Sequence, residues 1–472
     1  MKEPLKADYS EVKTLQRKRF PVLVIYVAGL LLLLYSCEFL SEYGVEYVSL
    51  LISYVIVGGL LCFSVCKRNA DLFEPIILIF LLWIGLFSVA PILLTKAGRT
   101  SIYGVGFMEG CLKGTGIYIA AAVAFYLGYY STKVDSAEMN YTSLSGSAVN
   151  THNMLQLMTI IWFVCYSIAL GYEVLCLGRS FSYILSIGRY GEISDAAMVE
   201  TSLAFLINFA YSLIIPWLYI MFISHNRLLK IMTTALMVVL YVVCGWRFIL
   251  VIMGASFVTV YYVNKNRRPK AAIVLGGMVL AIVAFTLIGN ARHDIRNGNA
   301  FEWYFDWDTI LATFETNFNL YQPYYGVVAH YPKDYSFTLG EGMVFDTLIT
   351  FVPRAIWHGK PLARDFACLR AIRNSVGDAV VDRAGMAIPN IGEIYIDFGG
   401  IGVVILMFIW GHYMKKSTAL YKTNIVSFER LLVYSVIYSL SFQFVTRGYM
   451  PNNFYLFIFL LWPGFILLNK VK

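Results

Sequence analysis

The chain has little charge for its length. Only 14% of its 472 residues are charged, whereas soluble globular proteins average about 25%. Hydrophobic residues make up 59%, and apolar runs long enough to cross a bilayer, about 20 residues each, recur from Phe20 to Leu468. This balance excludes an ordinary soluble protein. It predicts an all-α, polytopic integral membrane protein that forms a single membrane domain, 1–472.

The chain also lacks the common cofactor and metal signatures. Its eight cysteines show no CxxC or other metal-type spacing, and it has no P-loop or other nucleotide-binding motif. Asp306 and Asp308 form a short acidic pattern that many glycosyltransferases use for a divalent metal, but two residues are a weak signal. We therefore expect no metal and no cofactor. The net charge of +8 indicates a cytoplasmic face attracted to anionic lipid, not a nucleic-acid partner.

Hydropathy predicts about twelve membrane-spanning helices. They lie near 21–40, 46–66, 72–95, 114–131, 153–177, 202–224, 228–244, 248–264, 271–290, 391–414, 428–446 and 453–469. With the N-terminus inside, the inner segments hold 21 of the 37 lysines and arginines and the short outer loops hold 7. By the positive-inside rule, both termini are expected in the cytoplasm. The long polar segment 291–390, between helices 9 and 10, is then a periplasmic or extracellular loop.

Basic residues at the outer boundary are candidate anion ligands. Arg247 and Arg447 occupy short turns between predicted spans, where a charge is costly and is usually functional or paired. Arg354 and Lys360 lie in the long loop on a segment that two prolines keep from being a regular helix. Together these four side chains could converge on one anion, although an arginine near a helix end also reaches water easily. Arg292 is either an anion ligand or part of a solvated helix end.

The long loop also offers a candidate general base. Glu315 lies among aromatic residues, where desolvation would raise its pKa toward the range of a useful base, but a loop helix facing water is an equal alternative. His293 and Glu393 are lesser candidates, since the helix dipole alone favours an acid at the position of Glu393. The loop's aromatic residues suit stacking on sugar rings or a small hydrophobic core. They are Trp303, Tyr304, Trp307, Tyr321, Tyr324, Tyr325, Tyr331 and Tyr335.

The end of this loop carries a family resemblance. The motifs are Pro353-Arg-x-x-Trp357-x-x-Lys360-Pro361, Gly385-x-Ala-x-Pro389 and Gly392-Glu-x-Tyr-x-Asp-Phe-Gly399-x-x-Gly402. They resemble the late-loop signature of bacterial Wzy-type polysaccharide polymerases, which link lipid-borne repeat units of O-antigen, capsule or common antigen. The turns that hold Arg247 and Arg447 are similar to that family's pattern as well. His358 stands where the family often has proline, which leaves its role open.

The resemblance implies a membrane glycosyltransferase with GT-C-like architecture in the bacterial inner membrane. Its substrates would be undecaprenyl-diphosphate-linked oligosaccharides, and its partners membrane lipids and a chain-length regulator protein. Arg247, Arg354 and Glu315 are the expected catalytic residues. The expected diphosphate- or sugar-binding residues are Arg292, Lys360, Arg447, Trp357, Tyr395 and Glu393.

Two other functions remain open. An O-antigen ligase would pass the glycan to a different acceptor. A transporter is the alternative from another class, because twelve helices with both ends inside is a common transporter layout. The near absence of charge within the spans and the polar outer loop favour chemistry at the membrane surface.

Overall fold

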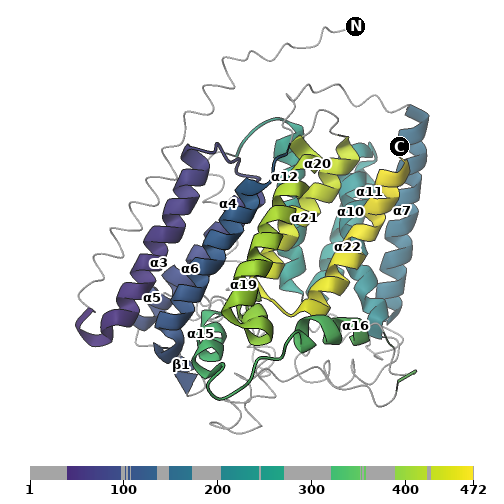
Figure 1. Ribbon diagram of the computed structural model, residues 1–472. Helices are drawn as coiled ribbons and strands as arrows, with labels where there is room; N and C mark the ends of the chain where they lie inside the picture. The colour runs from purple at the N-terminus through teal and green to yellow at the C-terminus, as the bar shows by residue number, and fades with distance from the viewer. Residues whose placement is uncertain are drawn as a thin grey trace, which may run out of the picture.

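The computed structural model shows a bundle of helices. The described residues are 40–96, 101–102, 105–106, 108–134, 148–172, 204–243, 246–269, 320–350, 352, 356–357, 388–422 and 427–470. Within them the helices run up and down the bundle (Figure 1), and the strands are confined to one antiparallel pair, β1 (Ser101–Ile102) and β2 (Val105–Gly106). The described part of the chain is thus helical, as the sequence predicts.

The long helices bury two apolar cores. The first core draws mainly on α3 (Leu40–Cys66), α4 (Pro75–Ile84) with its continuations η2 (Gly85–Val89) and α5 (Ala90–Lys96), α6 (Met108–Ser131), α15 (Tyr321–His330) and α19 (Asn390–Ser417). The second draws mainly on α7 (Ala148–Gly171), η4 (Ala204–Leu213), α10 (Ile214–Ile223), α11 (Arg227–Val243), α12 (Arg247–Asn264), α21 (Phe428–Thr446) and α22 (Met450–Lys470). Three short elements complete the described helices: η5 (Glu341–Phe345), α16 (Asp346–Thr350) and α20 (Ala419–Lys422).

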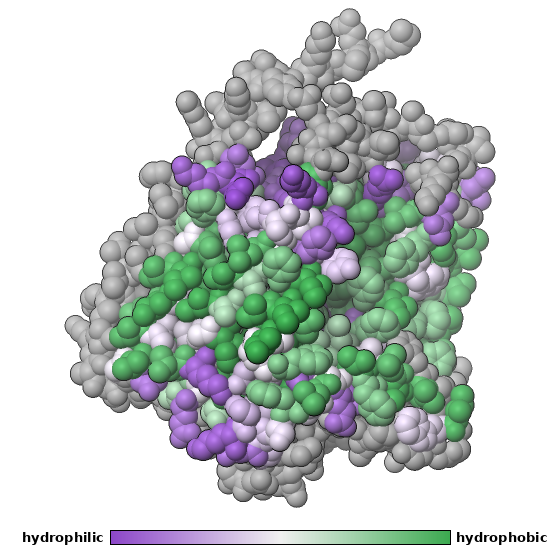
Figure 2. Space-filling view, viewed as in Figure 1, coloured by the Kyte–Doolittle hydropathy of each residue, from purple (hydrophilic) through white to green (hydrophobic). Residues whose placement is uncertain are grey.

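Seven helices among the described residues are long and apolar enough to cross a membrane. They are Gly44–Cys66, Pro75–Thr95, Met108–Ser131, Thr151–Gly171, Phe205–Ile223, Asn390–Lys422 and Met450–Asn469. Figure 2 shows the matching surface, an apolar band between two hydrophilic ends. A polytopic membrane protein is therefore confirmed. The expected spans at 228–244, 248–264 and 428–446 form helices that are not among these seven. The expected spans at 271–290 and, almost entirely, at 21–40 lie outside the described residues, so the number twelve stays a prediction.

Several helices begin earlier than hydropathy places them, and α6 shows why. Hydropathy places the start of a span at residue 114, but α6 begins six residues earlier, at Met108. Glu109 lies in the first turn, where the helix dipole favours an acid. Gly110 and Gly114 lie so close to Tyr325 of α15 that a Cβ on either would come within 2.5 Å of it. The early turns of α6 are thus stabilised by packing, which hydropathy does not register.

A buried ion cluster ties the helices together at one end. The Glu74 carboxylate accepts hydrogen bonds from Lys422 Nζ at 2.5 Å, Lys415 Nζ at 3.2 Å and the Tyr129 hydroxyl at 2.5 Å. Burial alone would raise the pKa of Glu74, but the two lysines outweigh it and lower the pKa to about 2. Because Glu74 caps α4 while its partners come from α6, α19 and α20, the cluster joins segments far apart in the sequence. α3 and α19 also end here (Figure 1), so the basic residues at or just after their last turns, Lys67, Arg68, Lys415 and Lys416, lie at this end.

α6 and α19 touch backbone to backbone near this end. A Cβ on Gly128 would lie 2.0 Å from the carbonyl oxygen of Phe408, and one on Gly411 would lie 2.3 Å from that of Phe125. Glycine at both positions is therefore required for the close approach, as is common between membrane helices.

At the opposite end, part of the expected outer loop is helical and packed. Tyr324 and Tyr325 of α15 are fully buried, and their hydroxyls donate to the carbonyls of Gly114 at 2.7 Å and Phe87 at 2.9 Å. For these two tyrosines the sugar-stacking interpretation was wrong, because their rings fill the first core. Trp303, Tyr304 and Trp307 lie outside the described residues.

Candidate active site

The first turns of α19 place two carboxylates on one buried face. Pro389 takes an extended conformation (φ −60°, ψ 157°) as the N-cap residue, and the helix begins at Asn390. Glu393 and Asp397 follow four residues apart, so they lie on the same side of the helix. Each is only 1% exposed. A buried carboxylate is costly unless it is paired or hydrogen-bonded, so both residues call for a structural or chemical explanation.

Glu393 has one oxygen satisfied and one without a partner. Its Oε1 accepts a hydrogen bond from the Met450 N–H at 2.9 Å, while Oε2 has no hydrogen-bond partner among the described residues. The neighbouring Gly448 N–H donates to the Ile388 carbonyl at 2.7 Å. A Cβ on Gly448 would lie 2.6 Å from Asn390 Cα and 2.9 Å from Glu393 Oε2. The turn between α21 and α22 therefore lies directly against the start of α19.

The same turn fixes Arg447. Its N–H donates to the Gln443 carbonyl at 2.8 Å, and its carbonyl accepts from Asn453 Nδ2 at 2.6 Å. The Arg447 guanidinium lies 5.9 Å from the centre of the Phe248 ring. Phe248 directly follows Arg247, the first residue of α12. The two turns that carry the predicted outer arginines are thus neighbours in space, although some 200 residues separate them in sequence.

Asp397 organises the segment that carries a third carboxylate. It accepts hydrogen bonds from the Thr338 hydroxyl and from the Met343 N–H, the latter at 2.7 Å. Its own carbonyl accepts from the Leu339 N–H at 2.8 Å. These contacts hold the turn before η5 and the first turn of η5 against α19. Asp397 is therefore already satisfied, and its role is structural.

The third carboxylate, Asp346, faces the protein interior, while apolar side chains of the same helical segment face outward. On η5 and α16, Val344, Phe345 and Leu348 are 55%, 45% and 65% exposed, whereas Asp346 is 6% exposed. Figure 1 shows α16 lying across the end of the bundle. An apolar outer face suits the membrane interface, and it turns Asp346 inward. Burial and the charge of Asp397 raise the pKa of Asp346, and its Oδ2 has no hydrogen-bond partner among the described residues.

Neutral polar groups without described partners surround these carboxylates. Asn390 Nδ2, Asn453 Oδ1 and both side-chain heteroatoms of Gln443 are buried and have no hydrogen-bond partner within the described residues. Gln443 lies one helical turn before Arg447, and Asn390 lies one turn before Glu393. Buried polar groups are normally hydrogen-bonded. Buried carboxylate and amide groups without described partners at one end of the bundle are what a polar ligand site requires.

The other predicted site residues are placed as follows. Tyr395 is 3% exposed, and its hydroxyl donates to the Tyr331 carbonyl at 3.1 Å. Trp357 is 38% exposed. The backbone of Arg247 is described but its side chain is not. Glu315, Arg354, Arg292 and Lys360 lie outside the described residues, so their convergence with Arg447 stays a prediction.

Sequence reasoning missed Asp346, Asn390 and Gln443. A usable signal existed for Asp346, because it stands in the run Val344-Phe345-Asp346 and a lone acid in an apolar run is rarely solvated. Gln443 stands similarly alone in the apolar end of α21. Asn390 carried no such signal, since asparagine after proline at a helix start is ordinary.

The fold and this site together define a polytopic membrane protein with a buried carboxylate and amide cluster beside an arginine at one end of its spans. The family model of the O-antigen polysaccharide polymerase Wzy matches residues 21–471, nearly the whole chain. The chain therefore belongs to the Wzy O-antigen polymerase family. Comparisons with curated proteins and with solved structures found no match.

Proposed function

We propose that this protein joins undecaprenyl-diphosphate-linked oligosaccharide repeat units into a surface polysaccharide, on the outer face of the bacterial inner membrane. Family membership supports an O-antigen repeat-unit polymerase acting on lipid-linked oligosaccharides. The observation that carries the finer proposal is the contact between the Arg447–Tyr449 turn and the start of α19. It brings to one end of the bundle a cation and a carboxylate whose second oxygen has no hydrogen-bond partner among the described residues.

The reaction needs two kinds of group. An acceptor hydroxyl attacks the anomeric carbon of the donor, the bond to the diphosphate oxygen breaks, and the lipid diphosphate leaves. Positioned arginines stabilise the leaving charge, and we assign that role to Arg447, Arg247 and Arg354. A base takes the proton of the acceptor hydroxyl. Glu393 is the described candidate, because its Oε2 has no partner within the described residues, and Glu315 remains the candidate from the sequence.

The topology supports an outer location for this chemistry. The carboxylates and Arg447 lie at the end opposite the Glu74 cluster, where Lys415 and Lys422 pair with Glu74 (Figure 1). Under the positive-inside rule that basic end is cytoplasmic. Both chain termini would then be cytoplasmic, and the site would face a compartment without nucleotide sugars. We accordingly expect the reaction to need no nucleotide and to survive EDTA.

The test supplies purified protein with lipid-linked repeat units and follows product length on a gel. A ladder of longer glycans is the expected result. Transfer only to a lipid A-core acceptor would instead make the protein a ligase. Uptake of the lipid-linked glycan into vesicles with no new glycosidic bond would make it a transporter. A mock preparation from cells that do not produce the protein serves as the control for activity from contaminants.

A further inference from the structure

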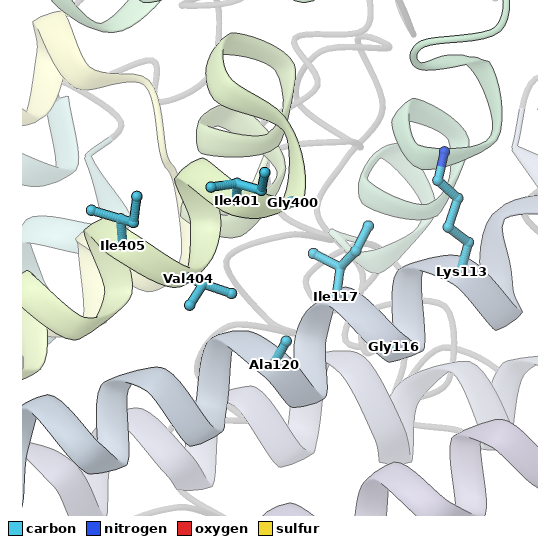
Figure 3. Close-up of a pocket in the computed structure, with 8 residues that line it drawn as sticks. All are labelled: Lys113, Gly116, Ile117, Ala120, Gly400, Ile401, Val404 and Ile405. Carbon is cyan, nitrogen blue, oxygen red and sulfur yellow. The ribbon is translucent and has the colours of Figure 1, made fainter.

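A groove opens on the membrane-facing side between α6 and α19. Its volume is about 550 Å³. Four residues of α6 and four of α19 line it: Lys113, Gly116, Ile117 and Ala120, and Gly400, Ile401, Val404 and Ile405. Figure 3 shows Ile117 and Ala120 across from Val404, with Lys113 at one end. Apart from the ammonium group of Lys113, the side chains that line the groove are apolar. The groove thus has a long apolar part and one cationic end.

The groove exists because the two helices separate between two tight contacts. Towards the inner end, Gly128 and Gly411 bring α6 and α19 into backbone contact. Towards the outer end, Gly110 packs against α15, with a built Cβ 1.9 Å from the Tyr325 carbonyl oxygen. Gly116, between them, has nothing within 4 Å of a built Cβ. A glycine facing open space contributes nothing to packing, so this position leaves room for a ligand.

A bend in α19 opens the other wall. Gly399 has φ 65° and ψ −167°, which breaks the helix without ending it. A Cβ at Gly399 would lie 3.0 Å from the ring of Phe337, whereas the next residue, Gly400, has nothing within 4 Å. Ile401, just after the bend, is 78% exposed. The bend therefore turns an apolar surface towards the lipid at the level of the groove.

Lys113 supplies charge complementarity for an anionic head group. Its Nζ donates to the carbonyls of Tyr331 at 2.6 Å and Val328 at 3.3 Å, and it lies 5.5 Å from the centre of the Tyr395 ring. Among the described residues no carboxylate forms an ion pair with it. The ammonium group is therefore bound by neutral carbonyls and not by a described carboxylate, and Lys113 stands where the groove meets the outer end.

The groove also leads to the candidate active site. Tyr395, which contacts Lys113, lies on α19 two residues after Glu393. Gly400 follows Glu393 by seven residues, which is about 10 Å of helix at a rise of 1.5 Å per residue, with the one non-helical residue Gly399 between them. A lipid whose diphosphate reaches Glu393 and Arg447 must leave its chain in the membrane beside α19. This groove is the recess that the described surface offers there.

We propose that the α6–α19 groove binds the isoprenoid chain of a lipid-linked diphosphate substrate, with Lys113 beside its phosphates. This inference rests on the proposed function and names the part of the protein that holds the lipid half of that substrate. The small residues Gly116, Ala120 and Gly400 give the groove the width that a methyl-branched chain needs. The competing occupant is an acyl chain of an ordinary phospholipid, and competition with phosphatidylglycerol distinguishes it from an isoprenoid chain.

The test uses a polyprenyl diphosphate that carries no sugar and has a photoactivatable diazirine in its prenyl chain. Purified protein in detergent is irradiated with this probe, and the labelled peptides are identified by mass spectrometry. We expect labelling on α6 and α19 that excess unlabelled polyprenyl diphosphate prevents and equimolar phosphatidylglycerol does not. Gly116→Phe fills the open space and should reduce labelling about tenfold, which corresponds to a loss of about 1.4 kcal/mol in binding free energy. Lys113→Gln should reduce it less.

Gly59→Phe is the matched control. Gly59 lies in α3, within another membrane span, and also has nothing within 4 Å of a built Cβ. The same ring added there should leave labelling at the wild-type level. Wild-type labelling of Gly116→Phe would overturn the inference, as would equal displacement of the probe by phosphatidylglycerol.

The lipid-binding groove and the polymerase activity can be disproved independently of each other. If wild-type protein is labelled in the groove but does not join repeat units into longer glycans, the proposed function is wrong and the lipid site is supported. If Gly116→Phe polymerises with wild-type KM for the lipid-linked repeat unit and is labelled normally, the groove inference falls and the function stands. A KM raised about tenfold at Gly116→Phe, with kcat little changed, supports both, because the added ring removes only lipid binding.

Discussion

Gly448 and Glu393 lie in direct contact, although 55 positions separate them in the sequence. A side chain at Gly448 would press on the backbone of Asn390, with a Cβ 2.6 Å from its Cα and 2.8 Å from its nitrogen. Backbone cannot move aside as a flexible side chain does, so the turn would shift as a unit. The position of Arg447 relative to Glu393 therefore depends on glycine at residue 448.

The first prediction is that Gly448→Ala loses activity more than stability. A displacement of about 1 Å at a catalytic site can cost on the order of 100-fold in rate, and we expect a loss of that size in polymerisation. Gly254→Ala is the matched control, since nothing lies within 4 Å of a Cβ built there. Wild-type turnover by Gly448→Ala would show that the contact does not position the site.

The second prediction concerns the general base. Glu393→Gln keeps the size of the side chain and an oxygen to accept the Met450 N–H, but it cannot take a proton. If Glu393 is the base, kcat should fall about 100-fold or more, with KM nearly unchanged. Glu315→Gln is assayed in parallel. A large loss with Glu315→Gln and a small one with Glu393→Gln would transfer the role of base to Glu315.

The third prediction is acid lability at the opposite end of the bundle. Because the folded-state pKa of Glu74 is lowered to about 2 from an ordinary value of 4.5, its contribution is fully present above pH 4.5 and is lost as the pH falls toward 2. A shift of this size corresponds to about 3 kcal/mol. Glu74→Gln should lower the melting temperature in detergent near pH 7 and flatten its fall with acid. An equal effect of Glu109→Gln, at an exposed carboxylate, would contradict this assignment.

Much of the helical layout was predictable because hydropathy reports membrane burial directly. The bounds predicted at 428–446 match the helix α21, and those predicted at 248–264 differ from α12 by one residue, although neither helix is among the seven that are long and apolar enough to cross a membrane. The misplaced start of α6 shows the limit of the method, since Glu109 and Lys113 are charged and their turns are stabilised by contacts with α15. Hydropathy sees residue type, not neighbours.

The candidate site was less predictable, because its parts meet only in three dimensions. The sequence indicated Arg447 and Glu393 separately, but it explained Glu393 by the helix dipole and gave no reason to join it to residue 448. The hydrogen bond from the Met450 N–H to Glu393 is a long-range contact that no local pattern encodes. Asp346 and Gln443 are likewise defined by burial rather than by a motif.

The fourth prediction tests which end of the bundle faces outward. Single cysteines replace exposed residues in a cysteine-free background, one as Ser336→Cys and the other as Lys416→Cys. With the proposed topology, a membrane-impermeant thiol reagent added to intact cells should label residue 336 and not residue 416. Labelling of residue 416 alone would invert the topology and put the proposed site in the cytoplasm.

The fifth prediction separates anion recognition by Arg447 from simple charge. A guanidinium binds a phosphate through two parallel hydrogen bonds, whereas an ammonium acts as a point charge. If Arg447 stabilises the leaving diphosphate, Arg447→Lys should lose nearly as much activity as Arg447→Ala, on the order of 100-fold or more. Arg430→Lys, at the start of α21 and far from this site, is the control. Near-normal kcat in Arg447→Lys would mean that only positive charge is needed there, and the assignment of Arg447 as a bidentate ligand of the diphosphate would be wrong.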